Sequence, residues 1–164
     1  MSDHLNSPVT SQLDALKICY ELVEIPLNPD KKPVRSLEEL LAGQGRNPDQ
    51  IVRSLLFRTG SDRFVLLAVA GGGRADWSVL RKHLDERRLT MAEPDEVLAA
   101  TGYPIGAVPP VALPDAIRVL VDEGVFDFDR VVIGSGVLGY ALALDGSDLR
   151  RLLTAADIGV FVKR

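Results

Sequence analysis

The sequence is poor in the side chains that metal centres and disulfides require. Of its 164 residues, one is cysteine and two are histidine, so an intramolecular disulfide is excluded and a zinc ligand set is lacking. The lone thiol, Cys19, fits a reducing compartment. We therefore expect no metal and no cofactor.

Long apolar runs and an excess of positive charge are also missing. No run reaches membrane-spanning length, and residues 1–10 lack the pattern of a secretory signal. The net charge of −4 argues against a protein that coats nucleic acid electrostatically. We expect a soluble, cytoplasmic protein with no membrane or DNA partner. One domain is predicted at residues 11–164, after an unstructured segment at 1–10.

The familiar nucleotide and hydrolase motifs are absent. Gly71–Gly73 is not followed by the Gly-Lys-Ser/Thr of a phosphate loop. Gly134–Gly139 matches G-x-G-x-x-G, but Tyr140–Leu144 has the period of a strand, where a dinucleotide site needs a helix. Ser135 lacks the G-x-S-x-G spacing of a nucleophile elbow. An enzyme with this sequence must rely on backbone donors and positioning.

Local patterns predict alternating helices and strands. Thr10 or Ser11 is expected to cap a helix that runs to Lys17 and buries Leu13 and Leu16. Further capped helices are predicted at 37–42, 77–84, 93–100 and 147–153, the last capped by Ser147. Strands are predicted at 19–25, 54–58, 63–70, 89–92, 117–122, 130–133, 140–144 and 158–163. The irregular order with hairpins predicts an α/β (α+β) domain with a mixed sheet.

Two loops rich in glycine and proline stand out between the patterned segments. Thr101–Pro110 reads TGYPIGAVPP, and Gly134–Gly139 reads GSGVLG. Proline fixes φ and glycine permits positive φ, so each loop is expected to hold one shape. Such a loop is either a stiff connector or a surface whose backbone N–H groups face a ligand.

Four segments resemble, in order and spacing, the YbaK-like family of prolyl-tRNA editing domains. They are NPDQIVRSLLF at 47–57, TGYPIGAVPP at 101–110, VLVD at 119–122 and VIGSGVLGYALAL at 132–144. The resemblance implies that the α/β (α+β) domain has one mixed, curved sheet flanked by helices. It also implies a freestanding trans-editing hydrolase that releases a small amino acid, such as alanine or cysteine, from mischarged tRNA(Pro). Mischarged tRNA, and with it prolyl-tRNA synthetase, are the implied partners. The terminal ribose hydroxyl and a water are thought to perform the chemistry in such domains.

The resemblance also implies a set of site residues. Arg53, Gly106 and Gly134 would be catalytic, because the loop amides hold the ester carbonyl and Arg53 occupies the place of the family lysine. The substrate-binding set would be Ala107, Val108, Pro109, Pro110, Asp122, Ser135 and Gly136.

The sequence departs from the family at three places. Arginine at position 53 is a permanently charged planar fork that can hold a phosphate or carbonyl but cannot act as a base. Val137 and Leu138 stand where some relatives are basic, and Pro109 removes an N–H. Two functions therefore stay open: a deacylase, or a non-catalytic module that binds an aminoacyl-like ligand or a synthetase.

Overall fold

The computed structural model describes residues 5–163, which form five α-helices, two 3₁₀ helices and eight strands. In chain order these are α1 (Pro8–Ala15), β1 (Tyr20–Glu24), α2 (Leu37–Gly43), η1 (Pro48–Gln50), β2 (Val52–Thr59), β3 (Phe64–Ala70), α3 (Trp77–Leu84), β4 (Leu89–Met91), α4 (Pro94–Thr101), β5 (Arg118–Asp122), η2 (Glu123–Asp127), β6 (Arg130–Gly134), β7 (Tyr140–Asp145), α5 (Gly146–Leu152) and β8 (Asp157–Gly159).

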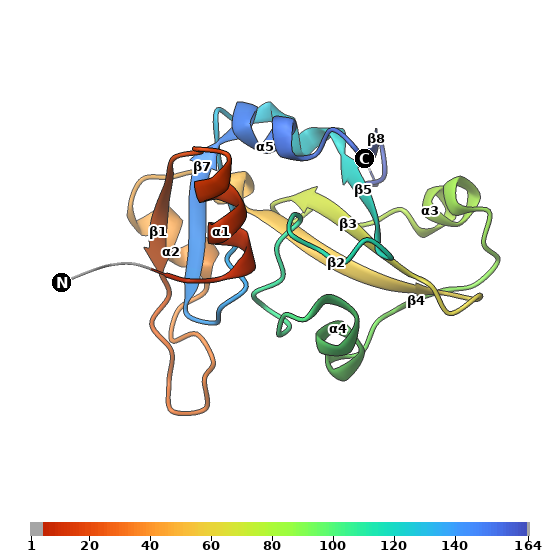
Figure 1. Cartoon of the computed structure of the whole chain (residues 1–164), viewed down its shortest axis with the longest axis horizontal. Helices are drawn as coiled ribbons and strands as arrows, with labels where there is room; N and C mark the ends of the chain where they lie inside the picture. Colours follow the sequence, from red (N-terminus) through yellow and green to blue (C-terminus); the bar gives the residue numbers. More distant parts are fainter. Residues whose placement is uncertain (1–4, 164) are drawn as a thin grey trace.

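The strands form two sheets rather than the single sheet expected. One has the order β1-β7-β6 and is antiparallel, and the other has the order β4-β2-β3-β5-β8 and is mixed. In Figure 1 the smaller sheet lies beside α1, while the larger one extends toward α3 and β4. The predicted α/β class with a mixed sheet is confirmed. The strands are divided between two sheets, and these adjoin at β2 of the larger sheet and β6 of the smaller one.

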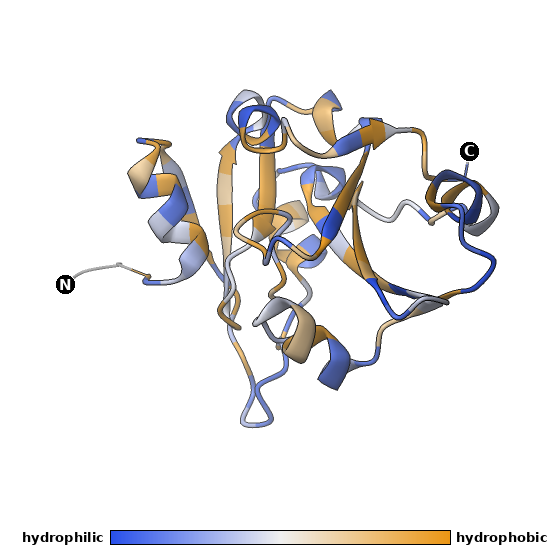
Figure 2. Cartoon of the chain, turned by 45° about the vertical axis from the view of Figure 1, so that its right-hand side comes forward, coloured by the Kyte–Doolittle hydropathy of each residue, from blue (hydrophilic) through white to orange (hydrophobic). Residues whose placement is uncertain are grey.

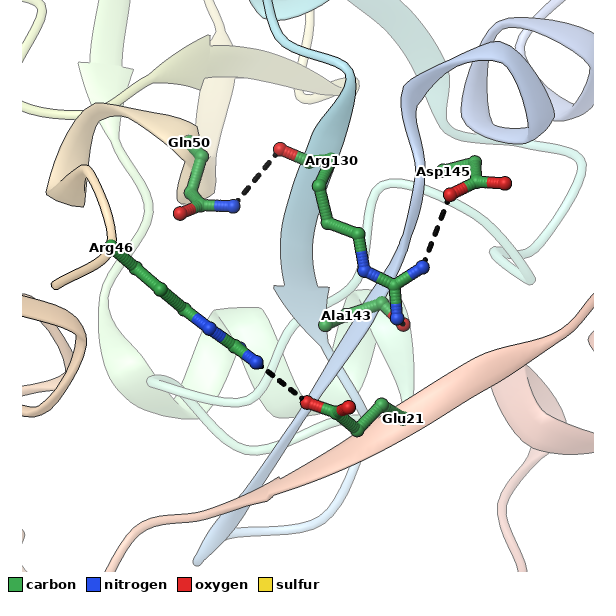
Figure 3. Close-up of polar contacts among 6 residues, drawn as sticks. All are labelled: Glu21, Arg46, Gln50, Arg130, Ala143 and Asp145. Carbon is green, nitrogen blue, oxygen red and sulfur yellow. Dashed lines mark hydrogen bonds and ion pairs between the residues drawn. The ribbon is translucent and has the colours of Figure 1, made fainter. Parts of the chain in front are cut away.

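The two sheets are joined where β2 begins. Ile51 forms a parallel bridge with Val132 of β6. One residue earlier, Gln50 is buried and its Nε2 donates to the carbonyl oxygen of Arg130 at 3.0 Å (Figure 3). Exposed ion pairs, Arg46 with Glu21 and Arg130 with Asp145, lie around this junction (Figure 3). Because exposed pairs contribute about 0–1 kcal/mol each, the buried contacts hold the junction.

The main core lies between the two sheets. Val52, Leu56, Leu66 and Leu142, from both sheets, belong to one cluster of buried side chains. Figure 2 shows apolar residues along the strands and polar ones on the outer turns. α3 covers the other face of the larger sheet, where Leu80 is 1% exposed and packs in a second cluster. No described helix has the length and hydrophobicity to cross a membrane.

The N-terminal helix begins earlier than its cap signals suggested. Ser7, not Thr10 or Ser11, is the N-cap, and its Oγ accepts from the Thr10 N–H at 3.2 Å. Lys17 adopts φ +57°, which is incompatible with a continuing helix, and Leu16 is 48% exposed where burial was expected. Of the segment 1–10 that was expected to be unstructured, residues 1–4 lie outside the described part, and Pro8 opens α1.

The C-terminal elements also differ from their sequence signals. The α5 N-cap is Asp145 rather than Ser147, and Asp145 makes no capping hydrogen bond with its side chain. β8 spans Asp157–Gly159 only, because Phe161 turns into the core and Val162 forms an isolated bridge with Ala75. Tertiary packing therefore overrides the local preference for a longer strand.

Asp122 is a structural residue at the end of β5. It is 3% exposed and its carboxylate accepts from the Phe161 N–H at 2.9 Å and from the Gly124 N–H at 3.0 Å. These bonds tie the C-terminal segment and η2 to the larger sheet. A carboxylate that satisfies buried backbone donors is costly to remove, because the donors are then left unpaired.

Replacing Asp122 with alanine is expected to lower the free energy of unfolding by about 2–4 kcal/mol, since two N–H groups lose their acceptor. Urea denaturation of Asp122→Ala, beside the exposed control Asp115→Ala, measures the loss. Equal unfolding midpoints for the two variants would contradict this assignment.

Candidate functional site

A cavity of about 380 Å³ lies at the junction of the two sheets. Such a volume is at the lower end of the range for small-molecule sites. Its wall is largely apolar and comes from β2, from the segment between β4 and Val108, and from β6, β7 and the start of α2. The lining residues are Ile25, Leu37, Glu38, Ile51, Val52, Arg53, Ser54, Leu55, Leu56, Met91, Ala92, Val97, Ile105, Gly106, Val108, Val132, Ile133, Gly134, Tyr140 and Ala141.

The two glycine-rich loops meet at this cavity through their backbones. The Gly136 N–H donates to the carbonyl oxygen of Ala107 at 2.8 Å. A Cβ at Gly134 would lie 2.5 Å from the carbonyl oxygen of Val108 and 2.8 Å from that of Ala107. Gly134 therefore permits a backbone approach that no residue with a side chain allows.

A side-chain hydroxyl in each loop holds that loop in shape through hydrogen bonds to the backbone. The Ser135 Oγ donates to the carbonyl oxygen of Tyr140 at 2.8 Å or of Val137 at 2.9 Å, and accepts from the Val137 N–H. The Tyr103 hydroxyl donates to the carbonyl oxygen of Ala112 at 2.6 Å. Burial raises the pKa of Tyr103, so this hydroxyl keeps the proton that it donates. A Cβ at Gly136 would lie 2.9 Å from the Tyr103 ring, so the two loops fit closely.

Arg53 is the cationic side chain of the cavity. It is partly buried on β2, and its guanidinium makes no hydrogen bond or ion pair with residues 5–163. The nearby Arg46, Arg58 and Arg130 each pair with a carboxylate. Arg53 thus retains five N–H donors for an anionic or carbonyl group in the cavity.

The structure separates the expected site residues into two groups. Arg53, Gly106, Val108 and Gly134 line the cavity together. The others lie outside its lining: Ala107, Pro109, Ser135 and Asp122 are buried, Gly136 contacts Tyr103, and Pro110 lines a separate cavity beside α1 and α5. Ala107, Pro109 and Pro110, which the resemblance placed in the substrate-binding set, are therefore not among the residues that line this cavity.

Several cavity residues were not expected from the sequence. Ser54 could have been noticed in the sequence, because it is a polar residue within an otherwise mostly apolar predicted strand. Leu56, Val97, Ile133 and Ala141 follow the ordinary pattern of core residues, and nothing in that pattern marks a cavity. Their shared site depends on how the two sheets meet.

Comparison with known proteins defines the class of this fold and site. The profile of the aminoacyl-tRNA editing domain matches residues 31–152. A crystal structure of a hypothetical protein superposes with a TM-score of 0.80 at 25% identity, covering 96% of this chain and all of the other. A crystal structure described as a candidate trans-editing enzyme for prolyl-tRNA synthetase superposes with a TM-score of 0.76 at 24% identity, covering 98% of this chain and all of the other.

Two curated relatives narrow the assignment. Proline–tRNA ligase of Kosmotoga olearia is 37% identical over 120 residues, which are 73% of this chain and 19% of the ligase. The multifunctional Ser/Thr-tRNA deacylase ProXp-y of Escherichia coli is 31% identical over 94 residues, which are 57% of this chain and 56% of the deacylase. The matched segment spans about a fifth of the ligases. The chain belongs to the aminoacyl-tRNA editing domain family, of the YbaK-like kind, whose activity is aminoacyl-tRNA deacylation.

Gly134→Ala is expected to disrupt the cavity, because its Cβ would overlap two carbonyl oxygens. Overpacking of this kind costs about 1–3 kcal/mol, and the loops must separate to relieve it. The melting temperature should fall, while Gly72→Ala, whose Cβ meets nothing within 4 Å, leaves it unchanged. A Gly134→Ala variant as stable as Gly72→Ala would show that the loops do not need this contact.

Proposed function

We propose that this chain hydrolyses the ester of tRNA carrying a small amino acid, of the alanyl- or cysteinyl-tRNA(Pro) type. The observation that carries the proposal is the unpaired guanidinium of Arg53 in an apolar cavity that Gly106 and Gly134 also line. The match to proline–tRNA ligases supports tRNA(Pro) as the tRNA and a synthetase as a partner. The match to a Ser/Thr-tRNA deacylase supports a short side chain.

The proposed reaction adds water to the ester carbonyl. The carbonyl carbon gains an oxygen from water, its bond to the ribose oxygen breaks, and the ribose oxygen takes a proton. The products are the free amino acid and uncharged tRNA. As in the family resemblance, the neighbouring ribose hydroxyl orients the water.

Arg53 is proposed to stabilise the negative charge that develops on the carbonyl oxygen. Arginine stays protonated at any working pH, so it serves as a donor and not as a base. A charge acts more strongly in a cavity with apolar walls than in bulk water. The supporting backbone around Gly106 and Gly134 keeps the ester close to this charge.

Arg53→Ala is expected to slow hydrolysis roughly 10- to 1000-fold, the range for losing one electrostatic contact to the reacting group. Arg53→Lys should keep or raise the rate, because lysine restores a cation and the family residue. Single-turnover hydrolysis of alanyl-tRNA(Pro) measures these rates beside those of Arg63→Ala, which changes an exposed arginine just before β3.

An Arg53→Ala rate equal to that of the unchanged protein would reject the role of Arg53. If neither the unchanged protein nor Arg53→Lys hydrolyses any mischarged tRNA, the chain is instead a module that binds an aminoacyl-like ligand or a synthetase.

Hydrolysis is also expected to select short side chains. Val52, Leu56 and Ile133 are less than 5% exposed and form rigid walls, so a larger side chain must displace packed core. Leucyl- and phenylalanyl-tRNA should react at least about tenfold more slowly than alanyl-tRNA, since size exclusion exceeds the effect of a single methylene. Single-turnover rates on the three substrates test this, and comparable rates would contradict a steric sieve.

A further inference from the structure

A hairpin between β1 and α2 stands beside the cavity, and we call residues 26–36 the basic hairpin. The chain on both sides of it reaches the cavity, because Ile25 before it and Leu37 after it belong to the lining. The Ile25 N–H also donates to the carbonyl oxygen of Gly139 at 2.7 Å, so the hairpin begins at the second glycine-rich loop. In Figure 1 the hairpin extends away from both sheets.

Hydrogen bonds within the basic hairpin hold its tip in one shape. The Asn28 N–H donates to the carbonyl oxygen of Lys32 at 2.7 Å, and the Asn28 Oδ1 accepts from the N–H groups of Asp30 and Lys32 at 2.9 and 3.0 Å. Lys31 adopts φ +63°, and its N–H donates to the carbonyl oxygen of Asn28 at 2.8 Å. The tip is therefore pre-organised, which lowers the entropic cost of binding a partner.

The basic hairpin carries positive charge that the protein does not neutralise. Lys31, Lys32 and Arg35 are exposed, and none of their side chains forms an ion pair or a hydrogen bond within residues 5–163. Asp30 is the one carboxylate of the hairpin, so the segment has a net charge of +2 in a chain whose net charge is −4. A local excess of this sign favours an anionic partner.

Neighbouring segments of the cavity do not offer such charge. The loop Gly134–Gly139, at which the hairpin begins, contains no charged residue. Arg46 and Arg130, near the junction of the sheets, are each paired with a carboxylate. Glu38 and Glu39 follow the hairpin in the first turn of α2, where the positive end of the helix dipole offsets their charge. The basic hairpin therefore supplies free cations that these neighbours lack.

We propose that the basic hairpin binds the phosphate backbone at the 3′ end of the tRNA whose ester lies in the cavity. The inference rests on the proposed function and assigns a surface of this chain to one part of its substrate. An ester held in the cavity brings the preceding nucleotides to the hairpin, since the chain on both sides of the hairpin lines the cavity. Four or five residues of extended chain place the tip roughly 15 Å from the cavity wall, a span that a few nucleotides cover.

The expected contact depends on charge and not on the base sequence. Lys31, Lys32 and Arg35 replace counterions on the phosphates, and the released counterions make the binding sensitive to salt. Contacts to phosphates fix the position of a nucleic acid without reading its bases. The hairpin thus holds the tRNA end in place while the cavity selects the amino acid.

Binding of uncharged tRNA(Pro) tests this surface without any hydrolysis. The triple variant Lys31→Gln, Lys32→Gln and Arg35→Gln removes three cations and keeps polar side chains. Its affinity should fall about 5- to 100-fold near about 0.1 M salt, and the slope of log affinity against log salt should decrease by up to about 3. The variant Lys31→Arg, Lys32→Arg and Arg35→Lys should retain binding, because it keeps the charge.

A matched control removes three cations elsewhere. Arg63, Lys82 and Arg87 are exposed and form no ion pair within the described part of the chain. They belong to or adjoin β3, α3 and β4, and in Figure 1 α3 and β4 lie away from the hairpin. The triple glutamine variant of these residues should keep both the affinity and the salt slope. If the two triple variants weaken binding alike, or if neither weakens it, the proposal is overturned.

Kinetics distinguish a surface that binds tRNA from one that shapes the cavity. On alanyl-tRNA(Pro) the glutamine variant of the hairpin should raise KM and leave kcat nearly unchanged, because it loses binding that the ground state and the transition state share. On 3′-O-alanyl-adenosine, which has no phosphate, this variant should react as fast as the unchanged chain. A slower reaction of the variant with alanyl-adenosine would overturn the proposal.

The present proposal and the proposed function can fail separately. Salt-sensitive binding of tRNA(Pro) that requires the hairpin cations supports the hairpin even if no mischarged tRNA is hydrolysed, in which case deacylation alone is rejected. Hydrolysis with equal tRNA affinity of all variants overturns the hairpin and leaves the deacylase. If the glutamine variant of the hairpin loses binding to prolyl-tRNA synthetase while it keeps tRNA binding, a protein occupies this surface and the proposal is overturned.

Discussion

The site depends on a backbone-to-backbone contact between two loops that are about thirty residues apart in sequence. Gly134 lies against the carbonyl oxygens of Ala107 and Val108, at distances that exclude any Cβ, and the Gly136 N–H donates to Ala107. With this contact in place, one wall of the cavity is rigid and carries no bulky side chain. The buried Ser135 and Tyr103 hydroxyls hold the two loops to their own neighbours, so neither loop moves freely.

The facing wall follows from the way in which the two sheets join. Ile51 bridges Val132, and Gln50 reaches the Arg130 carbonyl, which brings β6 close to the start of β2. β4 pairs with the far end of β2 only. The stretch between these contacts remains open, and it is there that Arg53 and Ser54 lie. Both residues are among those that line the cavity.

This arrangement agrees with the scarcity of conventional catalytic groups in the sequence. Among residues 5–163, no histidine and no cysteine lines the cavity. Asp122, the buried carboxylate that ends the VLVD segment, accepts hydrogen bonds from the backbone of Phe161 and Gly124 and thereby organises the end of the sheet. The proposed reaction accordingly places the ester between the Arg53 cation and a stiff backbone.

Local chemistry specified many elements correctly. Asp76 and Ser36 cap α3 and α2 as expected, because a capping bond involves residues only three apart. The cap expected at Ser147 was wrong, and so was the burial expected for Leu16. α5 begins at Gly146, where a Cβ would overlap the Phe128 carbonyl oxygen, so the position of that helix depends on the residue that follows η2.

By itself the sequence determined the class of fold, the two constrained loops and the charge at position 53, because each of these depends on residues that are close together in the sequence. Only the tertiary structure decided that Arg53, Gly106, Val108 and Gly134 share a cavity, while Asp122, Pro109 and Ser135 are buried outside its lining. It likewise exposed the unpaired hydroxyl of Ser54. The physical reason is that pairing and burial depend on which segments meet across the junction of two sheets, and local patterns do not encode that meeting.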